Sequence, residues 1–307
     1  MRNSNKTTSN NLGLLKKIPK GLFLPKVGVV LILPILLIRL FTGYYPLLYN
    51  FYYSFTNYSM VNIKYIFTID NYLRFFNDSS LKATITFTLI YTISYTAIVL
   101  IVSLSLANFL NLKFTGRNII RTIIFLPWAV SPVVTGFVAR SSFDSNFGYF
   151  YDFFKRIFHI DLVWLGVTWS ARTAVIVWAS WRDIGFWSVI FLVSLQLIPE
   201  ETIEASIIDG ANAFQLFFKV KLPMIKTQVM TMVLFSVLWS FLAFDIVHVL
   251  TGGGPGYSTS IFSETILKGF VNGMFSFAST QVIILFLFSI ILLSFGLIYI
   301  TKKREEM

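Results

Sequence analysis

Six long apolar runs are the feature that most restricts how this chain folds. A membrane-spanning helix needs about 20 consecutive, largely apolar residues. Runs of this kind occupy residues 27–55, 84–110, 118–142, 172–197, 226–250 and 278–300. They are too long and too continuous for the alternating pattern of an outer-membrane β-barrel. The sequence therefore predicts an all-α integral membrane protein with six transmembrane helices and no separate soluble domain.

Basic residues are distributed by side of the membrane, although the net charge of +11 could suggest a nucleic-acid partner. Cytoplasmic segments of membrane proteins carry an excess of Lys and Arg. The basic residues gather in the N-terminal tail, two connections and the C-terminal tail: Arg2, Lys6, Lys16, Lys17, Lys20 and Lys26; Lys113, Arg117 and Arg121; Lys219, Lys221 and Lys226; Lys302, Lys303 and Arg304.

This bias predicts a multi-pass protein of the bacterial cell membrane, embedded in the lipid bilayer, with both termini in the cytoplasm and no nucleic-acid partner. The expected organisation is a cytoplasmic tail over residues 1–25, retained and not removed as a signal, a membrane domain over 26–301, and a second cytoplasmic tail over 302–307. The membrane domain includes a cytoplasmic loop at residues 198–225.

That loop contains the sequence EASIIDGANAFQLFFKVKLP, from Glu204 to Pro223. Pro199 suits a first helical turn, and the acidic residues after it complement the helix dipole. Gly210 is expected to end this helix, and Asn212 and Gln215 have the spacing of a capping box for a second helix that closes at Pro223. Two short helices bury little apolar surface, so Ile203, Ile207, Phe214, Phe217 and Phe218 are expected to need cover from a partner.

The loop resembles the EAA loop of the permeases of binding-protein-dependent ABC importers. The resemblance rests on Glu204, Ala205, Gly210 and the pair Leu222 and Pro223, and the run Asp209, Gly210 and Ala211 resembles the carbohydrate-importing, maltose-permease-like branch. Ser206 and Val220 depart from the usual Ala and Ile. The strings LPWAVSPVVTG in the third run and WLG at residues 164–166 extend the likeness over most of the chain after the first run. The prolines of the first string, Pro127 and Pro132, are expected to bend the third helix.

This resemblance implies a type I ABC importer permease that translocates a sugar or oligosaccharide delivered by an extracytoplasmic solute-binding protein. It also implies a second homologous permease, expected as a heterodimer, and an ATPase dimer that binds ATP and Mg. The chain itself is expected to bind no cofactor and to catalyse no reaction. The implied contact with the ATPase is made by Glu204, Ala205, Ser206, Asp209, Gly210, Ala211, Val220, Leu222 and Pro223.

Several polar and aromatic residues lie inside the fourth and fifth apolar runs. Ionisable groups there are costly unless they pair with one another or line a polar cavity. The substrate path is therefore expected to include Trp181, Arg182, Asp183, Trp239, Asp245 and His248, although Arg182 and Asp183 could instead form a structural pair. Asp245 and His248 lie one turn apart, but two ligands without a third do not define a metal site.

A glycine-rich string follows the fifth run, with Gly252, Gly253, Gly254 and Pro255. It is not a phosphate-binding P-loop, because no Gly-Lys-Ser/Thr ending opens a helix. We interpret it as a tight bend on the outer side beneath a docking partner, and similar strings occur in sugar permeases.

Two other classes of function stay open from the sequence. A stand-alone ion-coupled transporter could use Asp245, His248 and the Arg182–Asp183 pair as an ion relay, but it would not explain the patterned loop. A membrane enzyme lacks a nucleophile-base pair or metal cluster in the sequence, and the chain has no cysteine. For an importer, the resemblance favours mono- or oligosaccharides as solutes, with glycerol phosphates as a second option.

Overall fold

The computed structural model describes residues 24–305, with side chains from Val30 to Lys302. The predicted tail over residues 1–25 therefore lies almost entirely outside the described residues, as does the end of the C-terminal tail. The chain divides into two compact units, one up to Tyr52 and one from Tyr53 onward. Within the described part of the chain, the β-structure is limited to a single bridge between Thr56 and Phe67.

The first unit is a helical rod that corresponds to the first apolar run. Helix α1 (Leu24–Arg39) continues through the π-helical turn η2 (Leu40–Tyr44) into α2 (Tyr45–Ser54). The hydroxyl of Thr42 donates to the carbonyl of Ile38 at 2.8 Å, four residues earlier, so its polar group is satisfied within the helix. Four tyrosines near its end are exposed, as suits side chains that anchor a helix at a membrane interface: Tyr44, Tyr45, Tyr49 and Tyr52.

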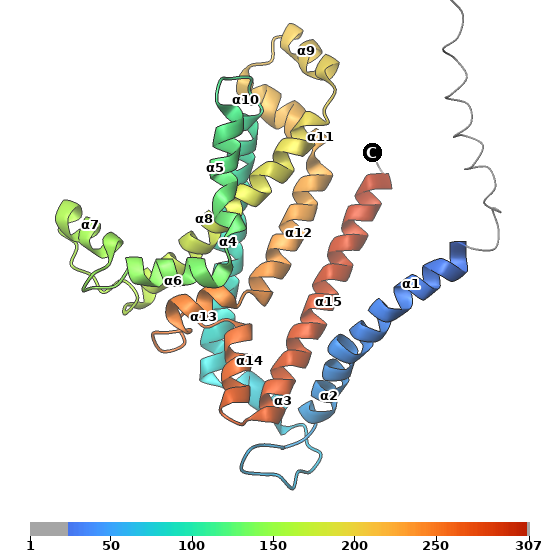
Figure 1. Ribbon diagram of the computed structural model, residues 1–307, viewed down its shortest axis with the longest axis vertical. Coiled ribbons are helices and arrows are strands. Elements are labelled where there is room, and N and C mark those ends of the chain that lie inside the picture. Colours follow the sequence, from blue (N-terminus) through green and yellow to red (C-terminus); the bar gives the residue numbers. More distant parts are fainter. Residues whose placement is uncertain (1–23, 306–307) are drawn as a thin grey trace, which may run out of the picture. The chain divides into compact units, whose positions relative to one another are not determined.

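The second unit is a bundle of long helices joined by short ones (Figure 1). The bounds are α3 (Asp70–Asn77), α4 (Ser79–Leu110), α5 (Arg117–Ala129), α6 (Pro132–Ser142), α7 (Tyr149–Phe158), α8 (Thr168–Gln196), α9 (Glu200–Ile208), α10 (Ala213–Gln215), the π-helical turn η3 (Leu216–Lys221), α11 (Leu222–Met224), α12 (Lys226–Leu242), α13 (Asp245–Thr251), α14 (Phe262–Val271) and α15 (Phe275–Glu305).

The core of this unit is built on α4 and α8, which form the most extensive helix pair. Large apolar side chains such as Phe87, Val99 and Phe191 are fully buried between the helices. Small residues let the backbones approach closely, because a Cβ at Gly185 of α8 would lie only 2.0 Å from the carbonyl oxygen of Ile124 in α5. Interhelical hydrogen bonds add to this packing.

Among the residues that the structure describes, four helices are long and apolar enough to cross a membrane, and the number rises to six if each of two bent pairs counts as one span. This result confirms the predicted multi-span class. The third predicted span is not straight, since α5 and α6 meet at 91°. Pro132 opens α6, where its missing N–H donor costs little, so the bend falls where the proline pattern indicated.

The fifth predicted span differs more from expectation. Helix α12 ends at Leu242, two residues interrupt it, and α13 starts at Asp245. No proline or glycine lies at this break, so the sequence pattern predicted one continuous helix over 226–250. The packing of Ile246 and Val247 into the core gives α13 its own position in the bundle.

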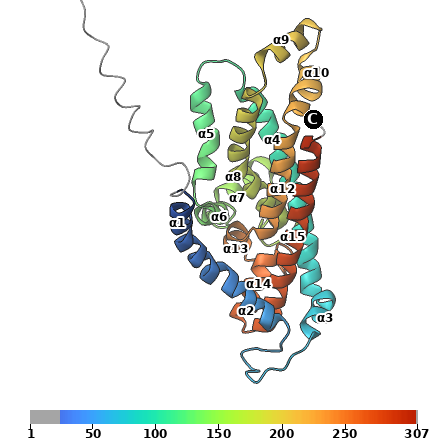
Figure 2. The same cartoon turned by 90° about the vertical axis from the view of Figure 1, so that its right-hand side faces the viewer.

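The two ends of the second unit are distinct in both views (Figures 1 and 2). The α9–α11 segment, the connection from α4 to α5 and the end of α15 lie at one end, and α3 and α14 lie at the other. Lys113 of that connection lies 3.5 Å from Glu200 of α9, although both side chains are exposed. Three of the basic segments predicted to share a side therefore do lie together.

Asp78 caps the N-terminus of α4. Its carboxylate accepts hydrogen bonds from the backbone N–H groups of Ser80 at 2.9 Å and Leu81 at 3.3 Å. Burial acts to raise the pKa of Asp78, but these bonds and the nearby charge of Arg74 outweigh it, so the pKa lies below its ordinary value. The capped form is therefore the ionised form.

We expect Asp78→Ala to lower the free energy of unfolding by about 1 kcal/mol, while Asp78→Asn, an equally good cap, stays near wild type at neutral pH. Because the folded-state pKa is lowered, the ionised group stabilises the fold above its unfolded pKa, and this contribution is lost as pH falls through the folded value. Thermal unfolding of the detergent-solubilised protein across the acidic range measures this. An Asn variant with the same acid sensitivity as the wild type would contradict the assignment.

Candidate functional site

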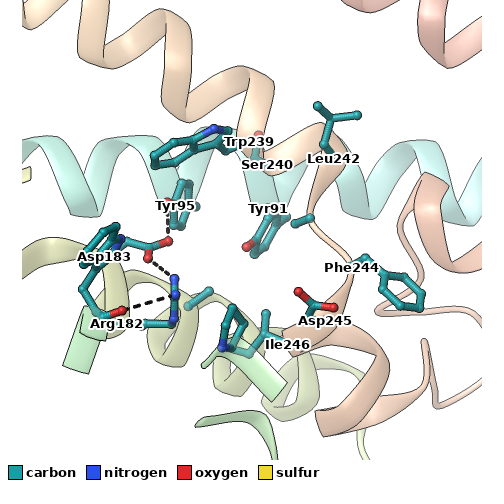
Figure 3. Close-up of a pocket in the computed structure, with 14 residues that line it drawn as sticks. Tyr91, Tyr95, Arg182, Asp183, Trp239, Ser240, Leu242, Phe244, Asp245 and Ile246 are labelled. Atoms are coloured by element: carbon teal, nitrogen blue, oxygen red, sulfur yellow. Dashed lines mark hydrogen bonds and ion pairs between the residues drawn. The ribbon is translucent and has the colours of Figure 1, made fainter. Parts of the chain in front are cut away.

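A cavity of about 360 Å³ lies among α4, α5, α8, α12 and α13 (Figure 3). Its walls combine aromatic, charged and small side chains: Tyr91, Tyr95, Trp128, Pro132, Ala179, Arg182, Asp183, Trp239, Ser240, Leu242, Ala243, Phe244, Asp245 and Ile246. The ends of α5 and α12, where the two spans break, contribute to it. Irregular backbone at membrane depth is tolerated where it is buried in protein or lines a wet cavity, so the position of the breaks is physically consistent.

The charged pair of α8 borders this cavity. Arg182 Nη1 lies 2.5 Å from Asp183 Oδ1, and the hydroxyl of Tyr95 donates to Asp183 Oδ2 at 2.7 Å. A second guanidinium nitrogen, Arg182 Nη2, lies 3.5 Å from the carbonyl oxygen of Trp128. Both charged side chains are mostly buried, at 16% and 15% exposure. The expected pair is therefore present and both residues also line the cavity, while their place on a substrate path stays a prediction.

Aromatic rings form much of the remaining wall. The rings of Tyr91 and Tyr95 stack with their centroids 5.5 Å apart. The ring of Trp239 packs against that of Trp187, with centroids 5.6 Å apart. The sequence analysis included Trp239 but missed both tyrosines. Their spacing of four residues within the second apolar run places them on one helix face, which was the available signal.

Asp245 differs from Asp183 in its surroundings. It is the first residue of α13, where a carboxylate complements the positive end of the helix dipole. Its side chain is exposed and borders the cavity beside Ile246 in Figure 3. Among residues 30–302, whose side chains the structure describes, no ion pair or side-chain hydrogen bond of Asp245 is recorded.

Two of the expected path residues lie elsewhere. Trp181 packs on Trp178, with centroids 5.2 Å apart, and does not line the cavity. His248 is directed to α14, where its Nδ1 lies 2.8 Å from the buried carboxylate of Glu264. Although Asp245 and His248 lie one turn apart on α13, Asp245 borders the cavity and His248 contacts α14, so the two side chains do not share a site.

The glycine-rich string forms a tight bend, as expected. Gly252 and Gly253 have φ of +57° and +80°, a region that favours glycine. Lys268 Nζ donates to the carbonyl of Gly252 at 2.6 Å, and a Cβ at Gly253 would lie 3.0 Å from that same nitrogen. The loop with Gly254 and Pro255 is thus held against α14, and its role beneath a docking partner stays a prediction.

The loop over residues 198–225 has the predicted local structure. Helix α9 begins after Pro199, and Gly210, with φ of +82°, follows its end. Asn212 Oδ1 accepts from the N–H of Gln215 at 2.9 Å, and Gln215 Oε1 accepts from the N–H of Asn212 at 3.0 Å. The expected capping box is therefore confirmed.

The end of the second loop helix was predicted too early. The helix continues through Pro223 to Met224, and the chain turns at Ile225 by 73° into α12. The π-helical turn η3 ends two residues before Pro223, and its wider bonding pattern lets the chain accommodate a residue without an N–H donor.

The loop presents an exposed apolar surface at its end of the unit. Ile207, Phe214 and Phe218 are 55%, 70% and 47% exposed. Phe217 instead packs against the core of the bundle, so it needs no outside cover. Glu204 is also exposed, and among the side chains that the structure describes no ion pair of Glu204 is recorded.

A bundle of membrane-length helices, broken at the wall of an internal polar cavity and bearing a projecting helical loop, defines a membrane transport protein. Residues 100–306 match the family described as binding-protein-dependent transport system inner membrane component, and the chain belongs to that family.

Similar proteins agree with this assignment. The chain is 29% identical to the trehalose/maltose transport system permease protein MalF of Thermococcus litoralis, over 91% of this chain and 94% of that protein. It is 31% identical to the probable starch degradation products transport system permease protein AmyD of Thermoanaerobacterium thermosulfurigenes, over 89% and 93%. A crystal structure of a bacterial ABC transporter involved in the import of the acidic polysaccharide alginate matches with a TM-score of 0.79 and 17% identity, over 90% of this chain and 95% of that chain.

These findings confirm the ABC importer permease fold and the assignment to a binding-protein-dependent transport system. The chain is a multi-pass membrane protein and a transport subunit. The stand-alone ion-coupled transporter is therefore set aside.

Proposed function

We propose that this permease carries a sugar or oligosaccharide through the cavity between α4, α8 and α12. The observation that carries the proposal is the cavity wall, where the partly exposed Trp128 and Trp239 offer aromatic faces beside charged and hydroxyl groups, and the buried Tyr91 and Tyr95 complete the lining. Sugar rings stack on aromatic faces, and their hydroxyls need nearby donors and acceptors. The names of the similar permeases MalF and AmyD, which refer to trehalose, maltose and starch degradation products, support the same class of solute.

The energy for transport would come from partner subunits. In this scheme a dimer of ATPase subunits binds ATP and Mg in the cytoplasm, and the 198–225 loop docks on one of them. Glu204 would pair with a basic residue of the ATPase, and the apolar side chains of Ile207, Phe214 and Phe218 would be covered by the same surface. The exposed state of these groups in the isolated chain supports this role.

The remaining partners follow from the same scheme. A second, homologous permease would complete the path as a heterodimer, and an extracytoplasmic binding protein would deliver the solute at the end that carries the glycine bend. Both termini and the 198–225 loop would face the cytoplasm of a bacterial cell. ATP-driven closure of the ATPase dimer would move the loops together and switch the bundles between inward-open and outward-open states by rigid-body motion.

The cavity assignment predicts that Trp239→Ala lowers sugar uptake by about tenfold, because it removes a stacking face from the cavity. Uptake of labelled sugar into proteoliposomes that contain the assembled transporter measures this. Trp181→Ala is the matched control, since it removes the same side chain from the neighbouring wall helix outside the cavity. Equal losses in the two variants would count against the cavity as the path.

A further inference from the structure

The charges around the cavity do not balance. Its lining contains one arginine, Arg182, and two aspartates, Asp183 and Asp245. We propose that this imbalance makes the cavity select neutral sugars over anionic ones, and that Asp245 is the residue that sets the selection. The inference rests on the proposed function, because it assumes that the cavity holds the solute.

The positive charge of Arg182 is balanced by a partner within the protein. Its Nη1 contacts Asp183, and its Nη2 lies near the carbonyl oxygen of Trp128. Asp183 in turn accepts a hydrogen bond from Tyr95 through its second oxygen. The guanidinium group is mostly buried in this network. Because Asp183 balances this charge at short distance, an anionic solute gains less from the arginine than it would from an unpaired one.

Asp245 is left as the uncompensated charge. It lies across the cavity from this network in Figure 3, and its side chain is exposed there. Within the described side chains, no basic group other than Arg182 lines the cavity. A solute in the cavity therefore meets a carboxylate that can accept hydrogen bonds but cannot donate them when ionised.

This arrangement discriminates by charge. Neutral sugars supply hydroxyl donors, and charge-assisted hydrogen bonds to a carboxylate are stronger than neutral ones. A uronate or a glycerol phosphate brings a second negative charge close to this carboxylate, and two like charges repel more strongly as the distance between them falls. The sequence had left glycerol phosphates as an option for the solute, and the charge of the cavity argues against them.

The test uses the assembled transporter in nanodiscs without binding protein, so that the permease alone selects. Tryptophan fluorescence quenching measures affinity, because Trp128 and Trp239 line the cavity. The probes are a neutral disaccharide and the same disaccharide with one CH2OH group oxidised to a carboxylate. We expect the wild type to bind the neutral probe at least about tenfold more tightly, and the ratio to fall at high salt.

Variants of Asp245 then identify the residue. Asp245→Asn is expected to bring the ratio of the two affinities close to one, and Asp245→Glu, which keeps the charge, is expected to preserve it. Equal binding of both probes by the wild type, or an unchanged ratio in Asp245→Asn, would overturn the charge selection but leave sugar transport standing. Absence of quenching by either probe would overturn both proposals. The wild-type comparison decides whether the cavity selects neutral over anionic sugars, even if Asp245→Asn does not fold.

Discussion

Replacing Glu204 with arginine is expected to leave the protein in the membrane but to lower sugar transport by on the order of tenfold or more, while ATP hydrolysis by the assembled complex continues. The physical reason is that Glu204 is exposed on α9 and would meet a basic residue of the ATPase, where an arginine repels. Coupling between two sites typically changes the affinity at one of them by about 5- to 150-fold, so a lost coupling contact has an effect within this range. Uptake and ATP hydrolysis, measured in the same proteoliposomes, give the ratio that defines coupling.

Glu201→Arg is the matched control, because it makes the same charge change on the same short helix outside the EAA-like residues. It is expected to retain coupling. Wild-type transport in Glu204→Arg, or an equal loss in Glu201→Arg, would refute the coupling role. Co-purification of the ATPase subunits with each variant shows whether the ATPase no longer binds, or binds but no longer couples ATP hydrolysis to transport.

Substitution of Gly210 tests the role of the same loop by changing its backbone conformation. A Cβ at this position would meet nothing within 4 Å, so steric contact does not restrict the side chain. The φ of +82° does restrict it, and Gly210→Val is expected to reorient α9 relative to α10 and lower coupling. Gly210→Asn, which tolerates this conformation better, is the control. If both variants transport equally well, the bend has no role in coupling.

Arg182→Ala is expected to destabilise the bundle strongly, by about 3–5 kcal/mol, because it leaves Asp183 buried without its partner. Thermal unfolding of the purified protein in detergent measures the loss. The double variant Arg182→Met with Asp183→Leu removes both charges and keeps apolar volume, and it is expected to regain much of the lost stability. A double variant as unstable as Arg182→Ala would show that the pair is not the source of the effect.

The two variants also separate stability from transport. The double variant removes charges that border the cavity, so it is expected to fold but to transport poorly. This combination would identify the pair as both a structural element and part of the solute path.

Much of the fold followed from local patterns. The length of the apolar runs identified the class of protein, and the proline string of the third run indicated a bend that the structure has between α5 and α6. The capping box of Asn212 and Gln215 and the left-handed turn at Gly210 were predictable because their hydrogen bonds and dihedral angles involve residues at most a few positions apart.

The cavity could be predicted only in part. Arg182, Asp183, Trp239 and Asp245 were expected because polar and aromatic residues inside apolar runs need a polar surrounding. Tyr91 and Tyr95 were missed, and Trp181 and His248, expected on the substrate path, do not line the cavity. The direction of a side chain around a helix depends on which neighbours the helix meets. The break at residues 243–244 contains no proline or glycine, so the sequence does not indicate it.

The sequence by itself therefore determined the membrane class, the positions of the apolar runs and most caps and bends of the 198–225 loop, since these depend on residues close together in the chain. Only the tertiary structure decided that Asp245 of α13 borders the same cavity as the Arg182–Asp183 pair of α8 and the rings of α4 and α12. The reason is that the electrostatic balance of a cavity is set by helices far apart in sequence, and their rotation about their own axes is fixed by packing.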